Sequence, residues 1–149
     1  GGVSLAMTAD LRVASAAARF GVTPGKLGLV YPPGDTRRLV KVIGPSHTRD
    51  ILFTGRIFPA SEAKEMGLIN QLVESGKALE AARNLAEEIS ANSQWSIRAM
   101  KQMLAGLDHG WTDDTPDAQS LFIEGFANED FTEGYRAFLS KRPAKFTYK

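Results

Sequence analysis

The chain has 149 residues, no cysteine, and a formal net charge of +1 that results from 18 basic and 17 acidic side chains. This length fits one domain or a large part of one, and without cysteine neither a disulfide nor a cysteine-ligated metal site can form. No segment is dominated by lysine or arginine and no apolar run approaches the ~20 residues that cross a bilayer, so we expect a cytoplasmic protein with neither a nucleic-acid nor a membrane partner.

The first part of the chain alternates between short helical and short extended patterns. A glycine pair precedes an apolar stretch, residues 3–7, which we expect to form the first turns of a helix. Residues 11–16 alternate in the manner of a strand, and residues 19–22 indicate a second short strand. The prolines and glycines of residues 23–34 exclude one regular helix, so a shaped loop is expected there.

Glycines then divide the chain into further short elements. Each of three predicted helices ends just before a glycine, a residue that readily adopts the left-handed conformation that closes a helix. These helices are residues 35–43 before Gly44, 45–54 before Gly55 and 59–66 before Gly67. Residues 68–73 then predict another strand.

Beyond residue 74 the pattern becomes wholly helical. Apolar residues at helical spacing predict one helix over residues 79–89 and another over residues 97–104, with a break at residues 92–93. Thr115 followed by Pro116 predicts the N-cap and the first residue of a further helix. The sequence therefore predicts an α/β fold class in which a helical region follows the strands.

We accordingly divide the chain into an α/β domain, residues 1–74, and an all-helical region, residues 75–149. The helical region carries aromatic side chains spaced about one turn apart, which need a surface to pack on. They are Phe122, Phe126, Phe131, Tyr135 and Phe138. The sequence leaves open whether that surface is the chain's own core or a neighbouring subunit.

Gly1 and Gly2 stand immediately before the first predicted helix. The N-terminus of a helix presents unpaired backbone N–H groups, and glycine lets a ligand approach them closely. Such donors stabilise an oxyanion that develops during a reaction. Taken alone, a glycine pair is more often an ordinary turn, so the rest of the sequence must decide between the two interpretations.

Several further segments occur in a fixed order and spacing. The glycine pair is followed by a helix of small residues and then by an acidic–leucine–basic triplet, Asp10–Arg12. Later segments of the same series are Phe20-Gly21, Leu27-Gly28, Thr36–Leu39, Leu52–Ile57, Ala60–Ile69 and Glu133–Pro143. Together they resemble the crotonase superfamily of enoyl-CoA hydratases and isomerases over nearly the whole chain, and the match is to the C-terminal part of such a protein.

The resemblance implies a spiral of ββα units followed by a helical trimerisation region, with trimers often paired into hexamers. It implies an acyl-CoA enzyme that acts on a coenzyme A thioester and needs no tightly bound cofactor. The thioester carbonyl would lie between two backbone N–H groups, one at Gly1 and the other in the family's N-terminal half. Lys141 matches a lysine that in relatives meets the CoA phosphates of an adjacent subunit, although a solvated lysine at a helix end is an equal interpretation.

The hydratases of this family use two glutamates as an acid–base pair, and by motif position these fall at Ser4 and Pro24. Neither side chain ionises usefully. The loop with Thr23, Pro24 and Tyr31 resembles instead that of methylmalonyl-CoA decarboxylase-like members, in which loss of CO2 yields the enolate and a tyrosine orients the carboxylate. We therefore expect Gly1, Ser4, Thr23 and Tyr31 to carry a lyase or isomerase reaction, with decarboxylation or other enolate chemistry favoured over hydration. Tyr31 could equally pack its ring on the prolines that follow it.

A second interpretation is a non-catalytic homologue that acts as an assembly module, because both glutamates are missing. The abrupt start at the glycine pair suggests a piece of a longer protein, so these residues alone are expected to be inactive. His47 and His109 lie in no metal-ligand spacing, and no metal site is predicted.

Overall fold

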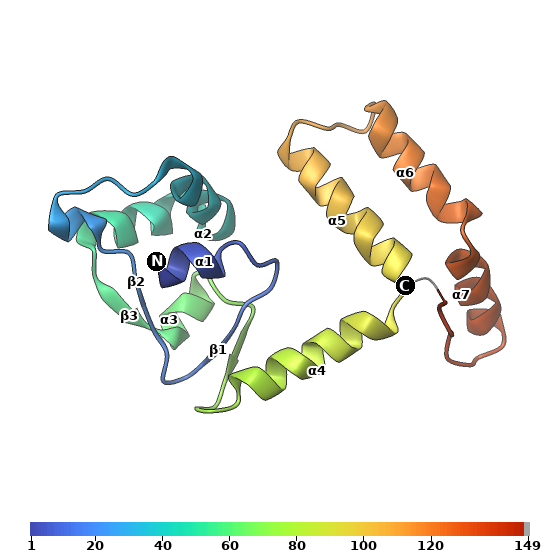
Figure 1. The fold of residues 1–149 in the computed structure, drawn as a ribbon, viewed down its shortest axis with the longest axis horizontal. Coiled ribbons are helices and arrows are strands. Elements are labelled where there is room, and N and C mark those ends of the chain that lie inside the picture. The colour runs from blue at the N-terminus through green and yellow to red at the C-terminus, as the bar shows by residue number, and fades with distance from the viewer. Residues whose placement is uncertain (148–149) are drawn as a thin grey trace. The chain divides into compact units, whose positions relative to one another are not determined.

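The computed structural model of the chain, which describes residues 1–147, divides within helix α4 (Ala78–Ala91) into two units (Figure 1). The first unit, Gly1–Asn84, mixes helices with short strands, as the α/β prediction requires. The second unit begins at Leu85 and is helical. The boundary lies beyond residue 74, where the sequence pattern changes, because the first turns of α4 belong to the first unit.

The first unit is built from two short two-stranded sheets and the helices between them. In chain order its elements before α4 are α1 (Gly2–Ala6), β1 (Val13–Ser15), β2 (Arg19–Gly21), the 3-10 helix η1 (Pro24–Leu27), α2 (Pro33–Thr54), β3 (Ile57–Pro59), α3 (Ala60–Glu65) and β4 (Gln71–Val73). β1 pairs with β4 in parallel, and β2 pairs with β3 in antiparallel orientation. The predicted strands are present but shorter than predicted, and β3 is an addition to the expected elements.

β3 is a short strand that is recognised through its pairing with β2. It has three residues and ends in Pro59, a residue that cannot donate a hydrogen bond to a sheet. Its central residue, Phe58, lies opposite Phe20 of β2, and the two rings stack with centroids 6.1 Å apart. A three-residue strand with proline carries no periodic signal, so the sequence could not reveal it.

Two glycines shape the long helix α2. Gly44 has a φ of 73° and a ψ of 168° inside the helix, directly before Pro45, so α2 is two helical segments joined at a kink. Gly55 ends the helix with a φ of 55°, and its N–H donates to the carbonyl of Ile51 over 3.1 Å. Both glycines adopt the left-handed region that side chains disfavour, which confirms the predicted helix ends.

The core of the first unit gathers around α2, β3 and the segment after α3. Its four largest fully buried side chains are Leu39, Ile51, Phe58 and Leu68. Burying an aliphatic or aromatic side chain of this size contributes about 1.5–3 kcal/mol. These residues hold the surrounding short elements in place, since none of those elements is long enough to be stable alone.

Charged side chains brace α2 against α3 at the surface. The Arg56 guanidinium lies 2.5 Å from the Asp50 carboxylate, also contacts the Glu62 carboxylate, and stands 5.4 Å from the centre of the Phe58 ring. Hydrogen bonds with Arg56 lower the pKa of both Asp50 and Glu62. The brace joins the end of α2 to the start of α3 across β3.

The second unit contains the end of α4 and then α5 (Gln94–Asp108), α6 (Pro116–Ala127) and α7 (Glu129–Leu139). α5 and α6 lie side by side as a helical hairpin, and α7 follows α6 after a single residue (Figure 1). No helix within residues 1–147 is both long and apolar enough to span a membrane.

Polar caps connect the starts of α5 and α7. The Ser93 hydroxyl accepts a hydrogen bond from the Ser96 N–H over 3.1 Å and donates one to the buried Asp130 carboxylate over 2.6 Å. The Asn128 side chain caps α7 by accepting from the Phe131 N–H over 2.9 Å. Asp130 therefore sits near two helix N-termini, where a negative charge is favourable.

The start of α6 departs from its expected geometry. Pro116 is the first helical residue and Thr115 is the N-cap, as predicted. The Thr115 hydroxyl, however, accepts from the Thr112 N–H over 2.8 Å rather than from the helix. The threonine thus fixes the turn before α6, a use that its identity alone does not distinguish from capping.

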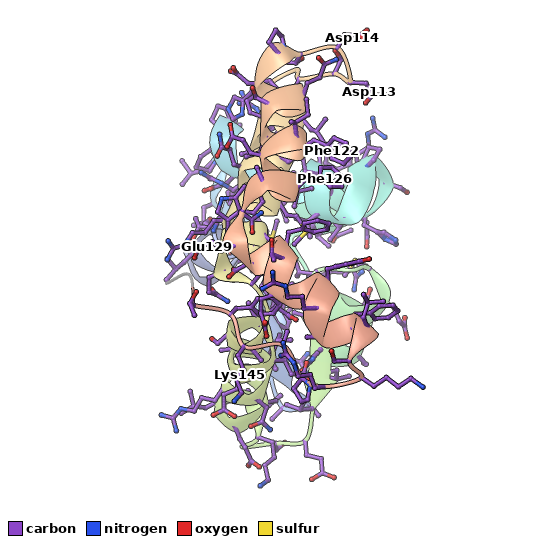
Figure 2. The ribbon with its side chains drawn as sticks, turned by 90° about the vertical axis from the view of Figure 1, so that its right-hand side faces the viewer. Asp113, Asp114, Phe122, Phe126, Glu129 and Lys145 are labelled. Carbon is purple, nitrogen blue, oxygen red and sulfur yellow. The ribbon has the colours of Figure 1, made fainter. Side chains whose placement is uncertain are left out.

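The aromatic side chains of α6 and α7 contact one another in a continuous row. Phe122 and Phe126 lie on the same side of α6 (Figure 2), with ring centroids 5.3 Å apart. Phe126 contacts Phe131 at 5.5 Å, and Phe131 stacks on Tyr135 at 6.4 Å. All four remain exposed, as does Phe138. The second unit therefore does not bury them within itself.

Candidate active site

The hydroxyl groups of Ser4 and Tyr31 meet in the first unit. The Ser4 Oγ lies 2.7 Å from the Tyr31 Oη, the ordinary length of an O–H···O hydrogen bond. Both side chains are half-buried. Two of the four predicted catalytic residues, 27 positions apart, are thus in direct contact.

The position of Ser4 follows from how α1 is anchored. Met7, at the end of α1, is buried in the core, and Val3 packs against that core. Behind α1, the Arg12 guanidinium donates to the carbonyls of Ala9 and Leu68, each over 2.6 Å. Burial lowers the pKa of Arg12, with neighbouring Asp10 opposing the change. These contacts hold the five-residue helix, which would not form alone.

The position of Tyr31 follows from the entry into α2. Pro32 is the N-cap of the helix and Pro33 its first residue, a place where proline fits without loss of a hydrogen bond. The Thr36 N–H donates to the Pro32 carbonyl over 2.9 Å, and the Thr36 hydroxyl donates to it over 3.0 Å. The ring of Tyr31 packs against the buried core. The backbone and ring of Tyr31 are therefore both fixed.

Thr23 and Pro24 lie in the loop between β2 and α2. Thr23 precedes η1 and is half-buried, and its carbonyl accepts from the Lys26 N–H over 3.1 Å. Pro24 is the first residue of η1, and its carbonyl accepts from the Leu29 N–H over 3.0 Å. Gly28 ends η1 with a φ of 69°. This loop is the shaped segment expected from its prolines and glycines.

Gly1 and Gly2 are exposed at the start of α1. The Gly1 carbonyl accepts from the Leu5 N–H over 3.0 Å, which is the first hydrogen bond of the helix. A Cβ built on either glycine would meet no atom within 4 Å. Packing within the described residues therefore does not require glycine at these positions.

Lys141 belongs to the second unit and is not part of the Ser4–Tyr31 pairing. It is exposed just after α7 with a φ of 51°, and its N–H donates to the Phe138 carbonyl over 3.2 Å. The next residue, Arg142, binds the Glu133 carboxylate through two nitrogens, over 2.7 and 2.9 Å. This ion pair and the Lys145 N–H lower the pKa of Glu133 to about 2.

Residues 1–147 contain no group of three or more histidine, cysteine, aspartate or glutamate side chains placed to hold a metal ion. His109 caps the end of α5, with its Nδ1 2.6 Å from the Ala105 carbonyl oxygen. The arrangement in the first unit is thus a neutral pair of hydroxyls, one of them on the short helix that begins at the glycine pair. Such a pair can bind and orient a charged acceptor.

Comparisons with known proteins extend over the whole chain. The family model described as enoyl-CoA hydratase/isomerase matches residues 1–149. The crystal structure of an enoyl-CoA hydratase/isomerase family protein from Hyphomonas neptunium is 73% identical, with a TM-score of 0.96 over 99% of this chain and 56% of that one. The structure of an enoyl-CoA hydratase from Mycobacterium tuberculosis H37Rv is 37% identical, with a TM-score of 0.90 over 99% of this chain and 59% of that one.

Among curated proteins, the crotonyl-CoA hydratase of Syntrophomonas wolfei is 34% identical and matches 100% of this chain and 58% of its own length. The chain therefore spans little more than half the length of these three relatives. The family model and the agreement of the folds confirm the resemblance seen in the ordered motifs and the predicted fold class. The chain belongs to the enoyl-CoA hydratase/isomerase family of the crotonase superfamily.

Proposed function

We propose that this chain forms part of an acyl-CoA enzyme that stabilises a thioester enolate, and that it generates this enolate by decarboxylation rather than by removing a proton. The observation that carries the proposal is the hydrogen-bonded pair of Ser4 and Tyr31. A hydratase of this family would place a glutamate at the position of Ser4, whereas a serine–tyrosine pair has no group that is a strong base near neutral pH.

Decarboxylation needs an electron sink and an oriented carboxylate, but no strong base. In a malonyl-type thioester the bond between the α-carbon and the carboxylate breaks, and its electron pair moves into the thioester to form the enolate. CO2 leaves, and the α-carbon then takes a proton from water. The Tyr31 hydroxyl would hold the carboxylate so that the breaking bond aligns with the thioester π-system.

A neutral hydroxyl suits this reaction better than a cation would. The negative charge leaves the carboxylate in the transition state and moves to the thioester oxygen. A cation on the carboxylate would stabilise the ground state more than the transition state and slow the reaction. The backbone N–H of Gly1 would serve as one of the two donors to the enolate oxygen, where the charge develops.

Two further residues have separate parts in the proposal, Thr23 near the reacting groups and Lys141 of an adjacent subunit at the coenzyme A phosphates. Thr23 would offer a further hydroxyl from the loop before η1. Lys141 would contact the phosphates of coenzyme A in an assembly of subunits, a trimer or a pair of trimers. The exposed aromatic row of α6 and α7 supports such an assembly, because soluble proteins seldom leave large apolar patches uncovered.

The decisive assay follows both reactions on the protein at its full natural length. Malonyl-CoA is the probe for CO2 release, and crotonyl-CoA is the probe for hydration. We expect CO2 release, reduced on the order of tenfold to a hundredfold in Tyr31→Phe because the carboxylate loses its orienting hydrogen bond. Ser90→Ala removes an exposed hydroxyl of α4, which belongs to neither the proposed site nor the aromatic row, and is the control expected to retain the rate.

Three outcomes separate the alternatives. Hydration of crotonyl-CoA without CO2 release would show that other residues replace the glutamates. Absence of thioester binding altogether would favour the non-catalytic assembly module. Residues 1–149 by themselves should not turn over either thioester, because Gly1 provides only one of the two oxyanion donors that the family uses.

A further inference from the structure

The contact between Ser4 and Tyr31 limits what the two hydroxyls can offer to a ligand. Each hydroxyl can donate one hydrogen and accept through two lone pairs. The hydrogen bond between the two hydroxyl groups, whose oxygens are 2.7 Å apart, uses one of the two hydroxyl hydrogens. Either hydroxyl can be its donor, so one hydrogen of the pair remains available to an external acceptor.

The chemistry of the two groups decides which hydrogen remains. A phenolic O–H is a stronger donor than an aliphatic hydroxyl, and a carboxylate is a stronger acceptor than either oxygen. With a carboxylate bound, the favoured arrangement has Ser4 donating to the Tyr31 oxygen and Tyr31 donating to the carboxylate. A chain of hydrogen bonds in this direction is cooperative, because each donation strengthens the next.

Rotation of the phenolic O–H bond is the conformational freedom that remains to the Tyr31 side chain. The ring packs against the core and the backbone enters α2 through two prolines. A phenolic hydrogen lies close to the ring plane and can point to either side of the oxygen. A hydrogen bond from Ser4, on an α1 that is itself fixed by buried Met7, selects one of these two directions.

We propose that Ser4 is a positioning residue, which orients the Tyr31 hydroxyl toward the α-carboxylate of the acyl-CoA substrate and thereby selects carboxylated thioesters. This inference rests on the proposed decarboxylation. Ser4 would act by orienting Tyr31 and would not itself contact the reacting atoms.

The test is a double-mutant cycle on the full-length protein with malonyl-CoA as substrate. We expect Ser4→Ala to lower kcat/KM about tenfold, the size of one well-placed hydrogen bond. In a Tyr31→Phe background the same change should have less than about a twofold effect, because residues that act through one another do not add. Ser90→Ala removes an exposed serine hydroxyl bonded to the Ala86 carbonyl over 2.7 Å and serves as the control.

A second measurement separates positioning from mere structural support. Equilibrium binding of sulfoacetyl-CoA, in which a sulfonate that cannot leave as CO2 replaces the carboxylate of malonyl-CoA, is compared with that of acetyl-CoA. Ser4→Ala should reduce the preference for the sulfonate thioester about tenfold and leave acetyl-CoA binding unchanged. Threonine and valine have nearly the same shape, but only threonine keeps the hydroxyl. The preference should therefore persist in Ser4→Thr and be lost in Ser4→Val, even if Ser4→Ala perturbs folding.

Equal losses from Ser4→Ala in both backgrounds, a parallel weakening of both thioesters, or an unchanged enzyme would each overturn the role of Ser4. In those cases CO2 release by the wild type leaves the proposed function standing. A wild type that releases no CO2 from malonyl-CoA would overturn the proposed function, and the inference about Ser4 with it.

Discussion

The two units of the chain are stabilised in different ways. The first unit surrounds a cluster of large apolar side chains, with Leu39, Ile51 and Phe58 each 0% exposed. In the second unit, as far as residue 147, the buried hydrophobic residues are two alanines, Ala118 and Ala137. The aromatic side chains of α6 and α7 remain between 46% and 80% exposed.

Polar contacts connect parts of the second unit. The Ser93–Asp130 bond joins the starts of α5 and α7, and the Glu133–Arg142 pair fixes the segment after α7. The contrast is between a unit that buries large apolar side chains and one that leaves its large aromatic side chains exposed. Mutations that truncate large buried apolar side chains should therefore lower the stability of the first unit most.

The largest expected effect comes from Leu39→Ala. Removing this fully buried side chain leaves a cavity and should lower the free energy of unfolding by about 2–5 kcal/mol. Leu104→Ala in α5 removes the same side chain where it is 66% exposed and should change fold stability by less than about 0.5 kcal/mol. Urea denaturation followed by circular dichroism gives both values, and similar losses would refute the contrast between the units.

Asp130→Ala should be the next most costly change. It leaves the buried Ser93 hydroxyl without its acceptor, which costs about 1–3 kcal/mol. Ser93→Ala and the double variant complete a cycle, again read by denaturation. A coupling energy near zero would mean that this bond does not hold α5 and α7 together.

Lys141→Gly is expected to stabilise the end of α7 while weakening ligand binding. Lys141 adopts a φ of 51°, which costs a side-chain-bearing residue about 1 kcal/mol relative to glycine. The thermal midpoint should therefore rise. If Lys141 contacts the CoA phosphates, the affinity for acyl-CoA should fall in the same variant. An unchanged affinity would show that Lys141 does not bind the phosphates.

The smallest effect concerns Glu133 and depends on pH. Its pKa is lowered from 4.5 to about 2 in the folded chain, so its ion pair stabilises the fold above pH 4.5 and is lost as the pH falls toward 2. Glu133→Gln should thus be slightly less stable than the wild type at pH 7, and the difference should vanish by about pH 2. Because the pair is at the surface, we expect only a small change, measured by denaturation at each pH.

Sequence alone determined the family and several of the helix ends of this protein. The ordered motifs that begin with the glycine pair led to the enoyl-CoA hydratase/isomerase family, which the family model confirms. Gly44 and Gly55 marked their helix ends correctly, because a left-handed residue is a local requirement that glycine meets at least cost. The start of α6 at Pro116 is a local signal of the same kind.

Only the tertiary structure decided which of the candidate residues meet. Ser4 and Tyr31 are 27 positions apart, and their contact depends on how α1 and the start of α2 pack on a shared core. The strand β3 and the brace around Arg56 likewise exist through their partners, β2 and α3. Local patterns report the conformation of a segment, whereas contacts across the chain follow from the burial of side chains that many segments share.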